Sequence, residues 1–259
     1  FFANNVLKPL GADTTGSQFL EPDGHFPNHI PNPENKEAMA SICKAVVDNK
    51  ADLGIIFDTD VDRSAIVDRI GKSINRNALI ALIAAVILRE HPESTIVTDS
   101  VTSDGLAKFI ADRNGKHHRF RRGYKNVINE SLRLNENGEE SWLAIETSGH
   151  AALRENYFLD DGAYLVAKLI VEAACLRKEG KELQDLIADL QQPVESKEIR
   201  FKIDTDDFKT YGEQVLEHIK AAAEKEHDWQ LVSPNYEGVR IACTDEKEQG
   251  WFLLRQSLH

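Results

Sequence analysis

Three aspartates at alternate positions, Asp58, Asp60 and Asp62, lie between two apolar runs in the stretch ADLGIIFDTDVDRSAIVD. In an extended strand their side chains would share one face about 6.6 Å apart, which is too far to ligate one small cation. Mg²⁺ holds its oxygen ligands at about 2.0–2.1 Å, so the chain must curl into a loop after Phe57. Converged carboxylates repel one another and retain a proton unless a cation neutralises them. The spacing therefore predicts a site for a hard divalent cation: Mg²⁺, Mn²⁺ or Ca²⁺.

Arg63 follows the aspartates directly, and its planar guanidinium would hold a phosphate oxygen beside the cation. An EF-hand calcium loop is excluded, because its sixth and twelfth positions require Gly and Glu and here hold Arg63 and Arg69. Two other interpretations stay open. One is a solvated acidic turn between two strands. The other is a haloacid-dehalogenase-like phosphatase with Asp58 as nucleophile and Asp60 as acid–base group, although Asp62 stands where such enzymes usually have Thr or Val.

The segment IETSGH follows another apolar strand and carries groups suited to sugar hydroxyls. Glu146 can accept hydrogen bonds from two neighbouring hydroxyls, and Ser148 adds a donor and an acceptor. Gly149 permits close backbone approach, and His150 ends the segment. An ordinary strand-to-loop turn uses the same residue types, so this motif taken alone is weak.

The most cationic stretch of the chain is KHHRFRRGYKN, at 116–126. We expect residues 122–125 to form a turn that presents cations, Lys125 among them, to a sugar phosphate. A charged edge strand and a nucleic-acid patch with Phe120 and Tyr124 for stacking are the alternatives. A second candidate phosphate cradle is RQSLH, where Arg255, a hydroxyl and backbone N–H groups follow a strand.

Strands and helices alternate along most of the chain, which predicts sheets built from crossover units. The apolar run ALIALIAAVIL is too short for a membrane span of about 20 residues and is predicted to be a buried helix. We expect a helix over PNPENKEAMASICKAVVDNK with Asn32 as N-cap and Pro33 as first helical residue. After residue 193, SKEIRFKID is predicted as a strand, followed by an amphipathic helix and an antiparallel pair in EGVRIACTD and GWFLLRQ.

Composition narrows the partners of the protein. The 259 residues carry a formal net charge of −12, which argues against general binding to nucleic acid or to membrane surfaces. With 41% hydrophobic residues the chain can bury real cores. Three widely spaced cysteines fit a reducing compartment, so a cytoplasmic location is expected.

Taken in order, these motifs resemble the α-D-phosphohexomutase family, the phosphoglucomutases and phosphomannomutases. Residues 58–63 (DTDVDR) are similar to the family's magnesium loop, usually D-G-D-A-D-R. The segment RGYK resembles its G-[FYH]-x-x-I loop, and ETSGH its sugar-specificity loop E-x-S-G-H. The stretch YEGVRI…GWFLLRQS is similar to the start of the family's fourth domain. The stretch FPNHIPNPE resembles the segment that precedes the helix of the family's second domain.

The resemblance implies an α/β fold of two consecutive domains with mixed, mainly parallel sheets and crossover helices, followed by part of a smaller α+β domain. Residues 1–73 would be a partial second domain, 74–194 the third domain and 195–259 a partial fourth domain. It also implies Mg²⁺, with Mn²⁺ as an alternative, and a phosphoserine that exchanges phosphate with hexose phosphates through hexose 1,6-bisphosphate. The site residues would be the metal ligands Asp58, Asp60 and Asp62, the catalytic residues Arg63 and Lys125, and the substrate-binding residues Gly123, Tyr124, Glu146, Ser148, His150, Arg255, Gln256 and Ser257.

Two departures from the family pattern stand out. Thr59 and Val61 replace the usual small residues of the metal loop, and a β-branched residue at Thr59 requires that its backbone avoid positive φ. A serine loop of the T-A-S-H-N-P type does not occur in these 259 residues. We therefore expect the first domain and the end of the fourth to be missing, and this chain alone to lack mutase activity. A non-catalytic sugar-phosphate binding protein stays open as an alternative.

Overall fold

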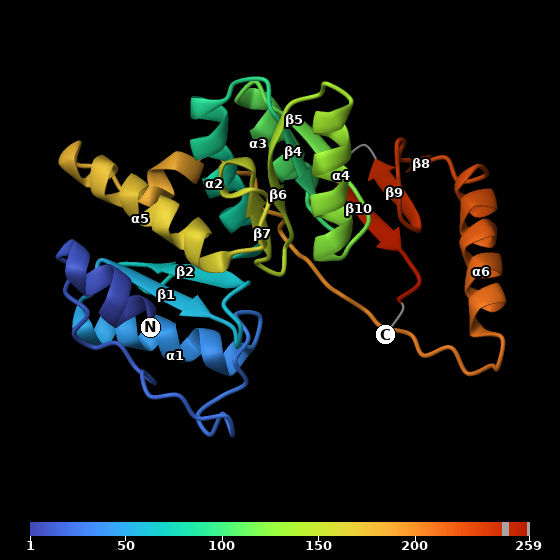
Figure 1. Ribbon diagram of the computed structural model, residues 1–259. Helices are drawn as coiled ribbons and strands as arrows, with labels where there is room; N and C mark the ends of the chain where they lie inside the picture. The colour runs from blue at the N-terminus through green and yellow to red at the C-terminus, as the bar shows by residue number, and fades with distance from the viewer. Residues whose placement is uncertain (245–248, 258–259) are drawn as a thin grey trace.

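Each sheet takes its strands from one continuous stretch of chain in the computed structural model, which describes residues 1–244 and 249–257 (Figure 1). The first sheet contains β1 (Leu53–Phe57), β2 (Ser64–Asp68) and β3 (Ser73–Ile74). The second contains β4 (Thr95–Thr98), β5 (Lys116–Arg119), β6 (Ser141–Ile145) and β7 (Ala151–Leu153). The third contains β8 (Trp229–Leu231), β9 (Val239–Thr244) and β10 (Gln249–Leu254). The α/β class with mixed sheets is thus confirmed.

The first sheet is antiparallel throughout its described strands, in order β1-β2-β3, so the expected parallel pairing is wrong for this sheet. The reason is the length of the connection. Only the aspartate loop separates β1 from β2, and Phe57 pairs with Ser64 at its ends. A parallel partner would need a crossover of a dozen or more residues.

The second sheet has the order β5-β4-β6-β7, with β4 parallel to both neighbours and β7 antiparallel to β6. The helices are α1 (Lys36–Asn49), α2 (Arg76–Glu90), α3 (Asp104–Asp112), α4 (Tyr124–Glu136), α5 (Gly162–Lys178) and α6 (Phe208–Ala223). The apolar run is the central part of α2 and is almost wholly buried, as predicted. Because β4, β5 and β6 run parallel, the loops that follow them meet at one edge of the sheet.

Helix α1 begins at Lys36 with Asn35 as its N-cap, so the predicted start at Asn32 and Pro33 is wrong. The Asn35 side chain accepts hydrogen bonds from the N–H groups of Glu37 and Ala38. Asn32 also caps a backbone N–H, that of Glu34, but in the turn before the helix. Two consecutive asparagine turns therefore precede the helix, and only the second starts it.

The C-terminal unit consists of α6 and the sheet of β8, β9 and β10. It contains the predicted antiparallel pair, β9 with β10, and the predicted amphipathic helix, α6. The predicted strand SKEIRFKID is absent: residues 196–204 form no described strand and run extended between α5 and α6 (Figure 1). Ile199 and Phe201, the apolar residues that suggested a strand, are 60% and 78% exposed. Alternating apolar residues specify a strand only where a sheet edge receives them. None of the described helices is long and apolar enough to cross a membrane.

Candidate functional site

The aspartate loop closes the β1–β2 hairpin and is held by Arg63. The backbone N–H of Arg63 donates to Asp58 Oδ1 at 3.1 Å and its Nε donates to Oδ2 at 2.7 Å. Each of Asp58, Asp60 and Asp62 has a carboxylate oxygen within 4.8 Å of the others. The predicted curl after Phe57 therefore brings the three carboxylates together.

The electrostatics of this loop suit a divalent cation. The pKa of Asp62 is raised to about 6, chiefly by burial. The negative charges of Asp58 and Asp160 act in the same direction, and the charge of His150 opposes them. Burial would also raise the pKa of Asp58, but the hydrogen bonds from Arg63 outweigh it and lower that pKa. Asp62 Oδ1 is buried and has no hydrogen-bond partner among the described residues. An all-oxygen donor set with an unsatisfied buried oxygen fits Mg²⁺ or Mn²⁺.

Positive φ in the metal loop falls on Val61, at +66°, and not on Thr59. The backbone of Thr59 therefore avoids positive φ, as its β-branched side chain requires. The strained β-branched residue is Val61, two positions later. Glycine adopts this region without strain. The Val61 carbonyl accepts a hydrogen bond of 3.0 Å from the N–H of Gly162, which fixes the loop against the first residue of α5.

We expect Val61→Gly to raise the free energy of unfolding by about 1 kcal/mol, because the relief of backbone strain exceeds the entropy cost of glycine. Urea denaturation of the chain measures the change. Val171→Gly is the matched control: Val171 is exposed within α5, where glycine should cost about 1 kcal/mol. A loss of stability in Val61→Gly as large as that in the control would contradict the assignment of strain.

The sugar-specificity candidates lie on the loop after β6, and Glu146 is their best-held member. Its Oε1 accepts a hydrogen bond of 2.6 Å from the N–H of Gly123, and Ser148 Oγ donates to Oε2 at 3.5 Å. Burial raises the pKa of Glu146. Gly149 lies against the metal loop: its carbonyl accepts from Ser64 N–H at 3.4 Å, and a Cβ on Gly149 would lie 2.7 Å from Ser64 O. Only glycine permits this approach at a φ of +100°.

His150 connects the sugar-specificity candidates with the metal loop. Its Nδ1 lies 2.8 Å from Asp160 Oδ2 and 3.5 Å from Asp62 Oδ2. Burial lowers the pKa of His150, but the hydrogen bond with Asp160 and the surrounding carboxylates outweigh this and raise it. The imidazole also stacks on Tyr124, with ring centroids 5.1 Å apart.

The predicted cationic turn is the N-terminus of α4, where Gly123 precedes the first helical residue with φ of +114°. The ammonium of Lys125 lies 5.7 Å from the Tyr124 ring centroid. The Arg122 N–H donates to Glu237 Oε2 at 3.1 Å, which connects the turn to the C-terminal unit.

The C-terminal candidates Arg255 and Gln256 contact different parts of the protein. Arg255 Nη1 lies 3.4 Å from Glu237 Oε1, so Arg255 and the cationic turn share one carboxylate. Gln256 Nε2 instead donates to the carbonyl of Phe208 at the start of α6. Ser257 is exposed, and the rest of the RQSLH segment, residues 258–259, lies outside the described residues.

Sequence reasoning missed three acidic residues that hold these loops: Asp99, Asp160 and Glu237. Asp160 supports His150, and Glu237 joins Arg122 to Arg255. Asp99 had a readable signal, because it follows the buried strand TIVT as Asp58 follows LGIIF. Glu237 lies in the motif YEGVRI, but nothing local indicates its contacts with Arg122 and Arg255.

Comparisons with known proteins agree on one family. Residues 1–71 match the family model for the phosphoglucomutase/phosphomannomutase alpha/beta/alpha domain II, and residues 75–194 match that for domain III. The chain is 30% identical over 257 residues to a phosphomannomutase/phosphoglucomutase of Pseudomonas syringae, which covers 98% of this chain and 51% of that protein. It is 28% identical to a phosphoglucomutase of Neisseria gonorrhoeae, with 99% and 52% covered.

A crystal structure of a phosphoglucomutase/phosphomannomutase family protein from Burkholderia thailandensis is similar in fold, with a TM-score of 0.73 at 26% identity. The match covers 91% of this chain and 46% of that one. The chain therefore spans about half the length of the relatives it matches. With both family models matched in consecutive order, the chain belongs to the phosphoglucomutase/phosphomannomutase family.

Proposed function

We propose that this chain forms the metal and sugar-recognition part of a hexose-phosphate mutase, which interconverts hexose 1-phosphate and hexose 6-phosphate of the glucose or mannose type. The observation that carries the proposal is that two motif loops far apart in sequence meet: Gly149 packs on Ser64, and His150 faces Asp62. The proposal includes a phosphoserine from outside these residues, a bisphosphorylated sugar intermediate and a cytoplasmic location.

In this proposal each group has a defined task. Asp58, Asp60 and Asp62 would hold Mg²⁺, which when bound neutralises charge on the transferring phosphoryl oxygens. Arg63 orients Asp58 through its Nε, and its remaining guanidinium N–H groups are suited to a phosphate oxygen.

The sugar and its second phosphate would meet the other loops. Glu146 and Ser148 would accept and donate hydrogen bonds to the sugar hydroxyls, with His150 and Tyr124 beside them. Arg255 would bind the phosphate group that is not reacting, and Lys125, as the second catalytic residue beside Arg63, would present its ammonium to the sugar phosphate.

The haloacid-dehalogenase-like alternative is disfavoured by the position of Asp62, where such enzymes usually have Thr or Val. It is also disfavoured by the two mutase family models, which match residues 1–71 and 75–194. The contacts of Asp58 do not decide between the two functions, because each oxygen accepts one hydrogen bond from Arg63 and keeps a lone pair for a metal ion or for phosphorus. A covalent aspartyl-phosphate that forms in the wild type and disappears in Asp58→Asn would support the phosphatase and contradict our proposal.

The proposal is tested by the activity of the full-length gene product toward glucose 1-phosphate, mannose 1-phosphate and glucosamine 1-phosphate, with and without Mg²⁺. We expect Mg²⁺-dependent turnover of the first or second substrate and little of the third. The 259-residue chain assayed alone should show no mutase turnover. Full-length protein that binds a hexose phosphate without converting it would instead indicate a non-catalytic binding protein.

Metal binding gives a second prediction that does not depend on turnover. Calorimetric titration of the chain with Mg²⁺ or Mn²⁺ should show one site, and Asp60→Asn should weaken it at least about tenfold, because one charged ligand is lost. Asp60 is exposed, so this change should leave the fold intact. Asp112→Asn, an exposed carboxylate on α3, is the control for net charge and should bind metal like the wild type.

A further inference from the structure

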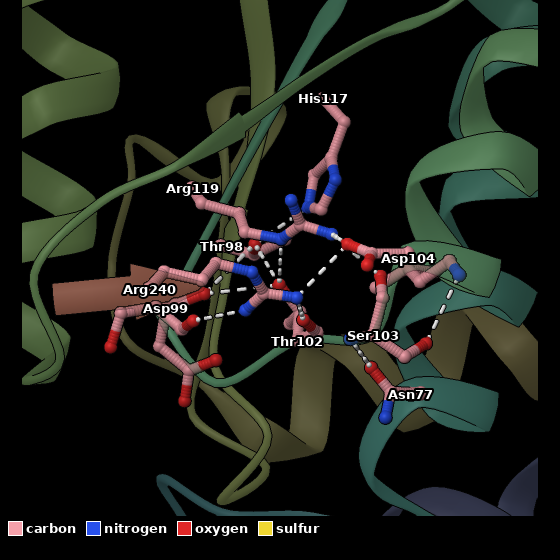
Figure 2. Close-up of polar contacts among 11 residues, drawn as sticks. Asn77, Thr98, Asp99, Thr102, Ser103, Asp104, His117, Arg119 and Arg240 are labelled. Atoms are coloured by element: carbon pink, nitrogen blue, oxygen red, sulfur yellow. Dashed lines mark hydrogen bonds and ion pairs between the residues drawn. The ribbon is translucent and has the colours of Figure 1, made fainter. Parts of the chain in front are cut away.

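Asp99 is a completely buried carboxylic acid that directly follows the last residue of β4. Figure 2 shows it beside the polar network of Thr98 and Thr102. Its Oδ2 accepts two hydrogen bonds from Thr147, at 2.6 Å from Oγ1 and at 3.3 Å from the backbone N–H. Its Oδ1 is buried and has no hydrogen-bond partner among the described residues.

Thr147 occupies the variable position of the motif E-x-S-G-H, between Glu146 and Ser148. Both of its donors bind one oxygen atom, so its backbone direction and its side-chain rotamer are fixed together. The same turn is closed by Gly149 N–H, which donates to the Glu146 carbonyl at 3.1 Å. The orientation of Glu146 and Ser148 therefore depends on the acceptor beneath them.

A buried acid of this kind is costly for the fold. Burial raises the pKa of Asp99 to about 7, and the charge of Glu146 adds to the shift. An apolar residue at this position would avoid the cost of desolvation. What the carboxyl provides is an acceptor for two donors of the sugar-binding loop, which an apolar residue would leave unpaired.

We propose that Asp99 is a positioning residue that holds the loop of residues 146–149 in its hexose-binding shape through Thr147. The inference rests on the proposed function, because it assigns that loop to the sugar. It extends that function by adding a residue outside the motif to the determinants of sugar recognition.

The test uses the matched pair Thr147→Val and Thr147→Ser in the 259-residue chain. Valine keeps the shape and removes the hydroxyl donor, whereas serine keeps the donor. Amide hydrogen exchange of residues 146–150 and calorimetric binding of glucose 1-phosphate are the two measurements. We expect Thr147→Val to increase the exchange rate of these amides about tenfold and to weaken the binding of glucose 1-phosphate about tenfold. In Thr147→Ser both quantities should stay within about threefold of the wild type. Asp99→Asn, which keeps an acceptor oxygen, should behave like serine, and Asp99→Ala like valine.

Exchange in the C-terminal part of α2 shows whether a variant remains folded, because Val86, Ile87 and Leu88 lie in the core and do not line the cavity beside residues 147–149. Unchanged loop exchange in Thr147→Val would overturn the proposal, and so would faster exchange with unchanged binding. If the wild type fails to bind glucose 1-phosphate, the proposed function fails. Exchange alone then decides whether Asp99 holds the loop.

Discussion

Replacing Arg240 by alanine is expected to lower the stability with which the C-terminal unit docks on the second sheet by about 3 kcal/mol. Arg240 lies on β9 and is only 2% exposed. Its guanidinium donates to the carbonyls of Ser100 and Thr102 at 3.1 and 3.2 Å and to Asp104 Oδ1 at 2.9 Å (Figure 2). Alanine would leave two buried carbonyls without these donors.

The loss exceeds that of a surface ion pair because most of the contact is inside the protein. Asp104 is itself 57% exposed, so its share is small and solvent can replace it. The buried part consists of the two carbonyl hydrogen bonds and the packing of the guanidinium 3.6 Å above the Trp251 ring. Urea denaturation with hydrogen exchange in β9 measures the change.

Arg121→Ala provides the matched control. Arg121 also connects the two units, since its Nε donates to the Tyr236 carbonyl at 3.1 Å, but the contact is exposed. We expect this variant to lose less than about 1 kcal/mol, because water replaces an exposed hydrogen bond at little cost. Equal losses in the two arginine variants would show that burial does not set the strength of the docking.

The local parts of the candidate site could be predicted from sequence. Asp58 and Glu146 each follow an apolar strand, and a polar residue at that point marks the edge of a sheet where sites form. The convergence of Asp58, Asp60 and Asp62 was predicted from the hypothesis that they ligate one ion, because ligands to one ion cannot stay in an extended strand.

The long-range parts could not be predicted. Glu237 binds the N–H of Arg122, and Arg240 binds Asp104, across more than 110 positions of sequence in each case. Glu237 and Arg240 lie in the motif YEGVRI and Arg122 lies in RGYK, but neither motif indicates which distant residue each of them contacts. Likewise, the prediction of a strand at 196–204 is wrong. Alternating apolar residues indicate which side chains would share one face of a strand, but not whether another element covers that face.

Asp99→Asn is expected to stabilise the chain at pH 8 and to have much less effect near pH 4. Burial raises the folded-state pKa of Asp99 to about 7, well above the usual value for aspartate. The folded protein therefore binds this proton more tightly than the unfolded chain does. Stability that depends on the neutral carboxyl is complete below about pH 4, falls as the pH rises to 7, and stays low above it.

A shift of about three pKa units corresponds to about 4 kcal/mol, which sets the upper size of the gain at pH 8. Asparagine cannot ionise, so it avoids this loss while its amide oxygen still accepts from Thr147. Urea denaturation at pH 5 and pH 8 measures the difference between variant and wild type, and Asp112→Asn controls for the loss of an exposed charge. Asp62 titrates in the same range and destabilises with the same sign, but it is present in both proteins and cancels in the difference. A stability difference that stays constant from pH 5 to pH 8 would mean that Asp99 keeps one protonation state, and that its cost to the fold lies elsewhere than in its charge.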